Sequence, residues 1–286
     1  MTAQPTTVPT AAPPISAPRG RPPGKPRGTA PAGFGTTRRR DLWQLAPLTQ
    51  LIVFTVCATY LLVSGVLWEP IFHTGYEADN YLSPLFSPLI VFPNMPDWLS
   101  PGLLILWIPI GFRATCYYYR KAYYRFYFAD PPGCAVGEPT IHRKFKLETA
   151  FPFILQNLHR YFLYLAFIPL FFLWVDVVKA WANFDTAGAA HPRLAFGAVL
   201  FLVNTALLTG YSLSCHSLRH VVGGRLDCFS CTRRQRARYE AWRWLSFLNR
   251  HHMAFAWASL LTVTATDLYV RLLVVGAVVD PAIVLR

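Results

Sequence analysis

The densest group of side chains that could bind a metal or a redox group lies in YSLSCHSLRHVVGGRLDCFSC, residues 211–231. Thiolates and imidazoles are the ligands that zinc, copper and iron–sulfur centres use in proteins. The stretch comes where a long apolar run gives way to a basic segment. We therefore expect a metal or redox centre near one face of a bilayer.

One interpretation of this stretch is local. Cys228-x-x-Cys231 could form a tetrahedral zinc site with His216 or His220, because residues four apart lie on one face of a helix. The cysteine pair lies in a polar loop, RLDCFSCTRRQRAR, and an unliganded basic loop is equally consistent with it.

The composition indicates a polytopic membrane protein. Of the 286 residues, 53% are hydrophobic and only 14% are charged, and the mean hydropathy is +0.30. Soluble domains contain nearer 25% charged residues. The six cysteines are scattered and do not form the framework of a secreted disulfide-rich domain. The first apolar run begins near residue 45, too far along the chain for a signal peptide.

We predict an all-α fold in which five transmembrane helices form a bundle, since apolar runs of about 20 residues match the hydrocarbon core. Residues 1–40 are rich in Pro and Arg and should be a disordered basic tail, and residues 41–286 should form the transmembrane domain. The expected spans are residues 47–68, 101–128, 151–181, 194–220 and 241–279.

The distribution of Lys and Arg gives the orientation. Residues 1–40 contain seven, residues 113–150 seven and residues 215–250 eight, whereas residues 69–100 contain none. Cytoplasmic loops carry the excess of positive charge, so the N-terminus should be cytoplasmic and the C-terminus outside. The net charge of +13 is thus explained by topology, without a nucleic-acid partner.

With this orientation, most cysteines and histidines lie toward the cytoplasmic side of the bundle. Ionisable side chains inside a membrane usually face the bundle interior and mark functional sites. The candidate metal ligands are Cys116, Cys215, His159, His216, His220 and His252. They could hold a bis-His haem b, or a [2Fe–2S] cluster of the Rieske type, which uses two Cys and two His.

Four segments carry a resemblance to a known family: RATCYYYRKAYYR, FPFILQNLHRYF, SLSCHSLRHVVGGRL and FLNRHHMAFAWASL. Over about residues 42–276 the chain resembles the single-chain, five-helix membrane anchor of actinobacterial succinate dehydrogenase. The resemblance implies a plasma-membrane component of respiratory complex II. It also implies a flavoprotein that oxidises succinate and an iron–sulfur subunit that docks on the cytoplasmic face, with assembly into a higher oligomer as an option.

The resemblance further implies a membrane-embedded Rieske-type [2Fe–2S] cluster and reduction of a quinone, menaquinone, by this anchor. The segments that carry it do not include Cys228 and Cys231, which then become peripheral. The alternatives are an anchor of the same complex that carries haem b, and an unrelated five-span protein with a cytoplasmic zinc hairpin.

The choice of ligands stays open among the six candidates. Cys116 and Cys215 are the two thiols at membrane depth on the cytoplasmic side, and the imidazoles rank in the order His216, His220, His159 and His252. Cys215 and His216 can both contribute only if the helix ends there, because neighbours on a helix point about 100° apart. Quinone should bind where a donor can polarise a carbonyl, and the candidates are Arg113, Tyr117, Asn157, Arg160 and Trp242.

Two acidic residues lie in the outer halves of the predicted spans. Asp176 and Asp267 could carry protons, but we favour pairing with Lys179 and Arg271, because residues three or four apart meet on a helix.

Overall fold

The computed structural model describes residues 41–284 apart from 43–44, 74, 79, 121–148, 150, 152, 185–187 and 226. The expected tail (residues 1–40) and residues 121–128 of the expected span 101–128 lie outside the described residues.

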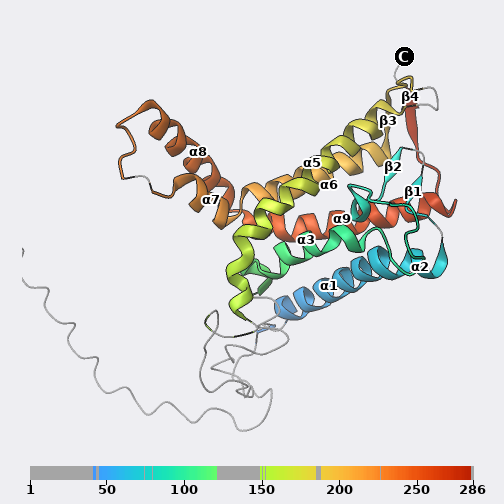
Figure 1. Ribbon diagram of the computed structural model, residues 1–286, viewed down its shortest axis with the longest axis horizontal. Coiled ribbons are helices and arrows are strands. Elements are labelled where there is room, and N and C mark those ends of the chain that lie inside the picture. Colours follow the sequence, from blue (N-terminus) through green and yellow to red (C-terminus); the bar gives the residue numbers. More distant parts are fainter. Residues whose placement is uncertain are drawn as a thin grey trace, which may run out of the picture.

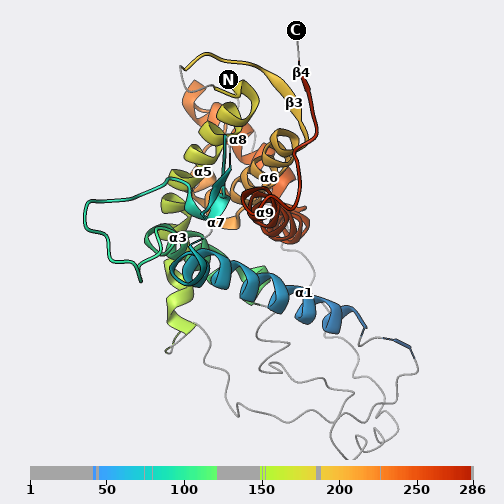
Figure 2. The same cartoon turned by 90° about the vertical axis from the view of Figure 1, so that its right-hand side faces the viewer.

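The described chain is mostly helical, and its long helices form an elongated bundle (Figures 1 and 2). The bundle contains α1 (Leu45–Leu62) with its π-helical continuation η1 (Val63–Trp68), α3 (Leu103–Ala114), α5 (His159–Ala182), α6 (Phe196–Leu213) and α9 (His252–Val274). By length and composition, four described segments could cross a membrane, at Leu48–Trp68, Ile154–Ala182, Phe196–Leu213 and His252–Val274. Helix α3 has 12 residues, about 18 Å at 1.5 Å per residue, which is shorter than the hydrocarbon core.

The helices pack in the order α3, α5, α6, α9, with α1 laid along α9. Helix α1 is the least buried of the candidate spans, since only 17% of its apolar window is covered by the rest of the chain. Its exposed side chains are aliphatic, as expected for a helix that faces lipid.

The loops at the end of the bundle that holds the chain's C-terminus contain short strands and turns (Figure 1). Strands β1 (Glu77–Ala78) and β2 (Tyr81–Leu82) pair antiparallel, as do β3 (Arg193–Ala195) and β4 (Ala282–Val284). The remaining short helices are α2 (Glu69–Phe72), η2 (Pro84–Phe86) and, at the opposite end before α5, η4 (Phe153–Leu158).

Three of the expected spans are interrupted at that opposite end. The run 101–128 breaks at Thr115 and Cys116, after which residues 117–120 are helical again. The run 194–220 breaks at Ser214 and Cys215, after which α7 (His216–Gly223) takes a new direction. The run 241–279 breaks at Arg250 and His251, between α8 (Arg233–Asn249) and α9. Helices α7 and α8 pack on each other as a hairpin that projects from the bundle (Figure 1). The physical reason is composition, because RRQRARYEAWRWLSFLN is too polar to continue through an apolar bundle.

Buried polar contacts fix α1 to α9 at the strand-bearing end. Asp267 is 0% exposed and accepts hydrogen bonds from Tyr60 (2.7 Å), Ser64 (2.5 Å) and Ser83. The expected pairs are present at the limit of ion-pair distance, with Asp267 and Asp176 each 3.9 Å from Arg271 and Lys179 respectively. Asp267 is therefore held mainly by hydroxyl groups from other segments, which hold the end of α1 against α9.

We expect Asp267→Ala to destabilise the protein strongly. The substitution leaves the hydroxyls of Tyr60, Ser64 and Ser83 without their acceptor and removes the carboxylate beside Arg271, and such a loss costs about 3–5 kcal/mol. Thermal unfolding of the purified complex, followed by tryptophan fluorescence, should show a lower midpoint for Asp267→Ala and a smaller decrease for Asp267→Asn. Glu240→Ala removes an exposed pair with Arg243 and should leave the midpoint unchanged. An unchanged midpoint for Asp267→Ala would show that these contacts do not hold α1.

Candidate metal centre

Four of the candidate ligands lie together where α3 and α6 end and α5 and α9 begin. Cys116 Sγ is 3.5 Å from His252 Nε2, and Cys215 Sγ is 3.2 Å from His159 Nε2. Cys116 and Cys215 are 1% exposed and His252 is 4% exposed. Two thiols and two imidazoles from four helices thus form one group, in which His159 is half-buried and the other three are buried.

The other ring nitrogen of each histidine is bonded to a hydroxyl. Thr115 Oγ1 lies 2.8 Å from His159 Nδ1, and Ser214 Oγ lies 2.7 Å from His252 Nδ1. Each imidazole also stacks on an aromatic ring, His159 on Phe112 (centroids 4.9 Å apart) and His252 on Tyr211 (5.0 Å). A stacked ring and a hydroxyl bond together leave each imidazole one orientation.

These contacts come from a motif that occurs twice. GFRATC (residues 111–116) ends α3 and GYSLSC (residues 210–215) ends α6, so both read Gly-aromatic-x-x-hydroxyl-Cys. The helices that pack on them begin with HRYF (residues 159–162) and HMAF (residues 252–255), which both read His-x-x-Phe.

The repeated glycines allow each helix pair to approach closely. A Cβ on Gly111 would lie 2.2 Å from the Phe162 ring, and one on Gly210 would lie 2.5 Å from the Phe255 ring. Such distances require a shift of the neighbouring ring. The α3–α5 and α6–α9 pairs are thus packed in the same way.

The two helix pairs complete each other. Each histidine bonds the hydroxyl of its own pair, while its Nε2 faces the thiol of the other pair: His159 bonds Thr115 and faces Cys215, and His252 bonds Ser214 and faces Cys116. Sequence reasoning named all four of these Cys and His side chains but missed both hydroxyls and both aromatic rings. A search of the chain for internal repeats would have aligned GFRATC with GYSLSC and so identified both hydroxyls and both rings.

Helix α6 ends at Ser214, the place where a helix end was the condition for Cys215 and His216 both to contribute. Cys215 has extended backbone angles (φ −61°, ψ 135°) between α6 and α7, so its thiol turns into the bundle. The side chain of the next residue, His216, stays exposed on α7.

His216 and His220, which ranked first among the imidazoles, lie outside this group. Their Nε2 atoms are 2.9 Å apart on the exposed surface of α7. Partial burial, then the neighbouring charges of His220 and Arg219, lower the pKa of His216. The linear proximity of these histidines to Cys215 was misleading, because α7 leaves the bundle.

The zinc hairpin does not assemble in the described part of the chain. Cys228 and Cys231 form a disulfide with each other. Among the described residues, no three His, Cys, Asp or Glu side chains converge as ligands of one metal ion.

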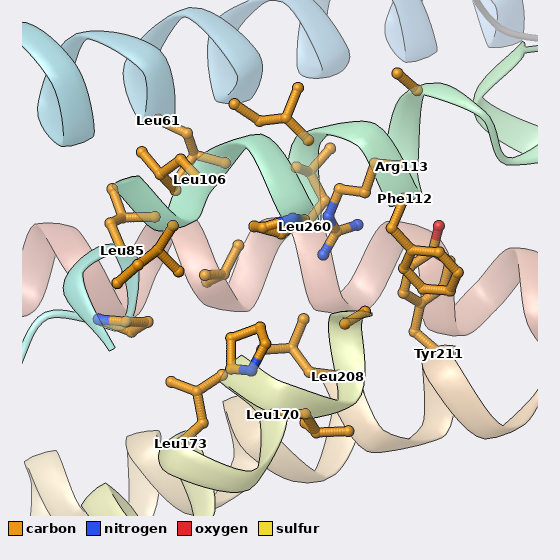
Figure 3. A pocket seen from close by; sticks show the side chains of 18 of the residues that line it. Leu61, Leu85, Leu106, Phe112, Arg113, Leu170, Leu173, Leu208, Tyr211 and Leu260 are labelled. Carbon is orange, nitrogen blue, oxygen red and sulfur yellow. The ribbon is translucent and has the colours of Figure 1, made fainter. Parts of the chain in front are cut away.

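An apolar cavity of about 220 Å³ lies inside the bundle and is lined in part by the rings that stack on the two histidines (Figure 3). Phe112 and Tyr211, the rings that stack on the histidines, lie at one end of it, and Leu85 lies at the other. Arg113 points into the cavity from α3 (Figure 3). Its guanidinium lies over the rings of Tyr211 (4.9 Å) and Tyr119 (5.4 Å).

Of the five quinone candidates, only Arg113 lines this cavity. Tyr117 is 60% exposed, and Asn157 and Arg160 are exposed where α5 begins. Trp242 belongs to the hairpin, where its ring packs against Gly223 and under Arg219. Tyr119, which is not among the five candidates, is a buried residue whose hydroxyl bonds both Arg113 and the backbone of α9.

Comparisons with known proteins place the chain in a family. The family model described as actinobacterial succinate dehydrogenase subunit SdhC matches residues 45–276. A solved chain of the Mycobacterium smegmatis Sdh1 complex in the apo form is similar, with a TM-score of 0.73 and 34% identity over 92% of this chain and 98% of that one. No curated protein matches. The chain therefore belongs to the actinobacterial succinate dehydrogenase subunit SdhC family and is a membrane-anchor subunit of a succinate dehydrogenase complex.

Proposed function

We propose that this subunit holds a Rieske-type [2Fe–2S] cluster through Cys116, Cys215, His159 and His252, and relays electrons from a docked iron–sulfur subunit to menaquinone. The observation that carries the proposal is the pairing of two buried thiols with two imidazole Nε2 atoms at 3.2 Å and 3.5 Å. A Rieske cluster uses this donor set.

The arrangement of the donors favours a cluster over the alternatives. The candidate ligands form two Cys–His pairs, whereas a structural zinc ion needs four ligands around one point. Both Nε2 atoms face sulfur atoms, which a bis-His haem would not require. The buried Tyr211 hydroxyl lies next to the Cys116 thiol, so it can donate to a thiolate ligand there.

When bound, a [2Fe–2S] cluster takes up and releases one electron at a time. The chain supplies a dry and rigid surrounding for it. Phe112 and Tyr211 cover the imidazoles, and Tyr119 and Leu163 are almost fully buried in the same core. A low-dielectric shell of this kind excludes water and influences the redox potential of a metal site.

Arg113 is the best-placed residue to orient the quinone. Its guanidinium bonds Tyr119, the Ala256 carbonyl (3.3 Å) and Ser259 (3.1 Å). A guanidinium carries five N–H donors, so donors remain for a quinone carbonyl after these three bonds. The cavity beyond it is lined by aliphatic side chains that suit an isoprenoid tail, including Leu106, Leu170 and Leu260. A cation at this depth is costly, which is typical of a functional residue.

The α7–α8 hairpin is the proposed docking surface for the iron–sulfur subunit, which in turn binds the flavoprotein. Helix α8 carries Arg233, Arg234, Arg236, Arg238 and Arg243. Arg238 holds the hairpin together by donating to the carbonyls of α7, and the others are exposed. The hairpin leaves the bundle where α6 ends and α9 begins (Figure 1), and the four candidate ligands lie at these helix ends. This end should face the cytoplasm of a plasma-membrane complex, as the positive charge indicates.

We expect Cys116→Ser and Cys215→Ser each to remove the cluster. Iron and sulfide content of the purified complex, together with the Rieske-like EPR signal of the reduced form, should fall to background for that centre, because serine is a poor replacement for a thiolate. Cys57→Ser is the matched control, since Cys57 is also a free, buried cysteine but belongs to α1. Stoichiometric zinc without an EPR signal, or the paired α and β bands of a haem, would contradict the proposal.

We expect Arg113→Gln to impair quinone reduction without affecting succinate oxidation. Loss of a hydrogen bond from a charged donor costs about 1.5–3 kcal/mol, or roughly 10–150-fold in kcat/KM for a menaquinone analogue. Turnover with a soluble dye that accepts electrons from the partner subunits should stay at the wild-type value. Lys179→Gln, an exposed cation on α5, should affect neither assay. Equal losses in both assays would show that Arg113 serves assembly and not quinone binding.

A further inference from the structure

We infer that the hydroxyls of Thr115 and Ser214 are positioning groups that hold both imidazoles as Nδ1–H tautomers, so that Nε2 is the ligating atom. This inference rests on the proposed function, since it concerns how the chain presents its ligands to the cluster. Both hydroxyls belong to the repeated motif, at the residue before each cysteine.

The position of the imidazole proton follows from the distances between each hydroxyl oxygen and its two partners. Thr115 Oγ1 lies 2.7 Å from the Gly111 carbonyl oxygen and 2.8 Å from His159 Nδ1. Two oxygen atoms come this close only with a proton between them, and a carbonyl has none to give. The single proton of the hydroxyl therefore points to the carbonyl. The proton of the second contact must come from His159 Nδ1.

The second motif repeats these contacts. Ser214 Oγ lies 3.1 Å from the Tyr211 carbonyl oxygen and 2.7 Å from His252 Nδ1. Because the motif is repeated, we assign it the same direction, in which the hydroxyl donates to the carbonyl and accepts from the imidazole. Both histidines thus carry their proton on Nδ1.

A neutral imidazole with its proton on Nδ1 has its lone pair on Nε2. That atom faces a thiol in both halves, at 3.2 Å from Cys215 and 3.5 Å from Cys116. A metal-bound histidine usually donates its other N–H to an oxygen acceptor, which fixes its tautomer and its orientation. Here the acceptor is in place before any ligand binds, because the helix itself holds the hydroxyl.

The role of the hydroxyls explains why the motif lies at helix ends. Thr115 and Ser214 are the C-cap residues of α3 and α6. The hydroxyl serves the histidine of its own helix pair, and the next residue presents its thiol to the histidine of the other pair. One dipeptide therefore positions two ligands in different halves of the site.

The test uses the intact complex with histidine labelled with ¹⁵N at Nδ1 alone or at Nε2 alone. Pulsed EPR of the reduced cluster should show the strong coupling of a ligating nitrogen only with the Nε2 label. Thr115→Val and Ser214→Ala should each change the coupling of one Nδ1 and lower the cluster content several-fold. Thr115→Ser keeps the hydroxyl and should therefore keep the wild-type Nδ1 coupling and cluster content.

Matched controls separate this effect from packing. Thr266→Val removes a buried hydroxyl that also bonds the carbonyl four residues earlier (2.7 Å), and Ser246→Ala removes a helical hydroxyl bonded to Trp242 (2.7 Å). Both controls should keep the wild-type spectrum. Strong coupling from the Nδ1 label, or wild-type spectra and cluster content in both Thr115→Val and Ser214→Ala, would overturn the inference. A wild-type complex with no nitrogen coupling from any label would instead overturn the proposed function.

Discussion

The site depends on two helices that must end inside the bundle. Residues i and i+1 of a helix point about 100° apart, so a hydroxyl and a thiol on successive residues of a continuous helix could not both reach the centre. At Thr115–Cys116 and at Ser214–Cys215 the helix stops after the hydroxyl, and the cysteine turns inward. The crossed contacts between the two helix pairs follow from these two turns.

A helix end in an apolar bundle leaves carbonyl groups without partners, and each costs free energy unless it is bonded. The chain satisfies them with tight turns and with side chains from other elements, and at the end of α3 Gln156 donates to the Ala114 carbonyl at 3.5 Å. Asn249 donates to the Ser214 carbonyl at 2.7 Å, so the residue that ends α8 bonds the end of α6. The break between α8 and α9 is thus linked to the break between α6 and α7. The first allows His252 to begin a new helix, and the second exposes the thiol of Cys215 to the site.

The sequence predicted the membrane class, the SdhC resemblance and a set of residues that contains all four side chains of the group, because these depend on composition, motifs and the period of a helix. It could not rank the histidines. His216 is next to Cys215 in the chain but leaves with α7, whereas His159 and His252 come from distant helices and reach the thiols only through tertiary packing. Asp267 illustrates the same limit, since its pairing with Arg271 was visible from the spacing but its bonds to Tyr60 and Ser83 were not.

The cavity and the candidate metal centre share one aromatic ring. Tyr211 lies between the guanidinium of Arg113, 4.9 Å from its centroid, and the imidazole of His252, 5.0 Å away and nearly parallel. The cation is attracted to the negative face of the ring, and the ring in turn keeps water from the histidine. Arg113 also bonds the backbone of α9 one turn after His252, at Ala256. The same contacts therefore position the residue proposed to bind quinone and the histidine proposed to bind the cluster. A change that displaces Tyr211 should disturb both Arg113 and His252. Electron release from the cluster and quinone binding would then depend on the packing of the same ring.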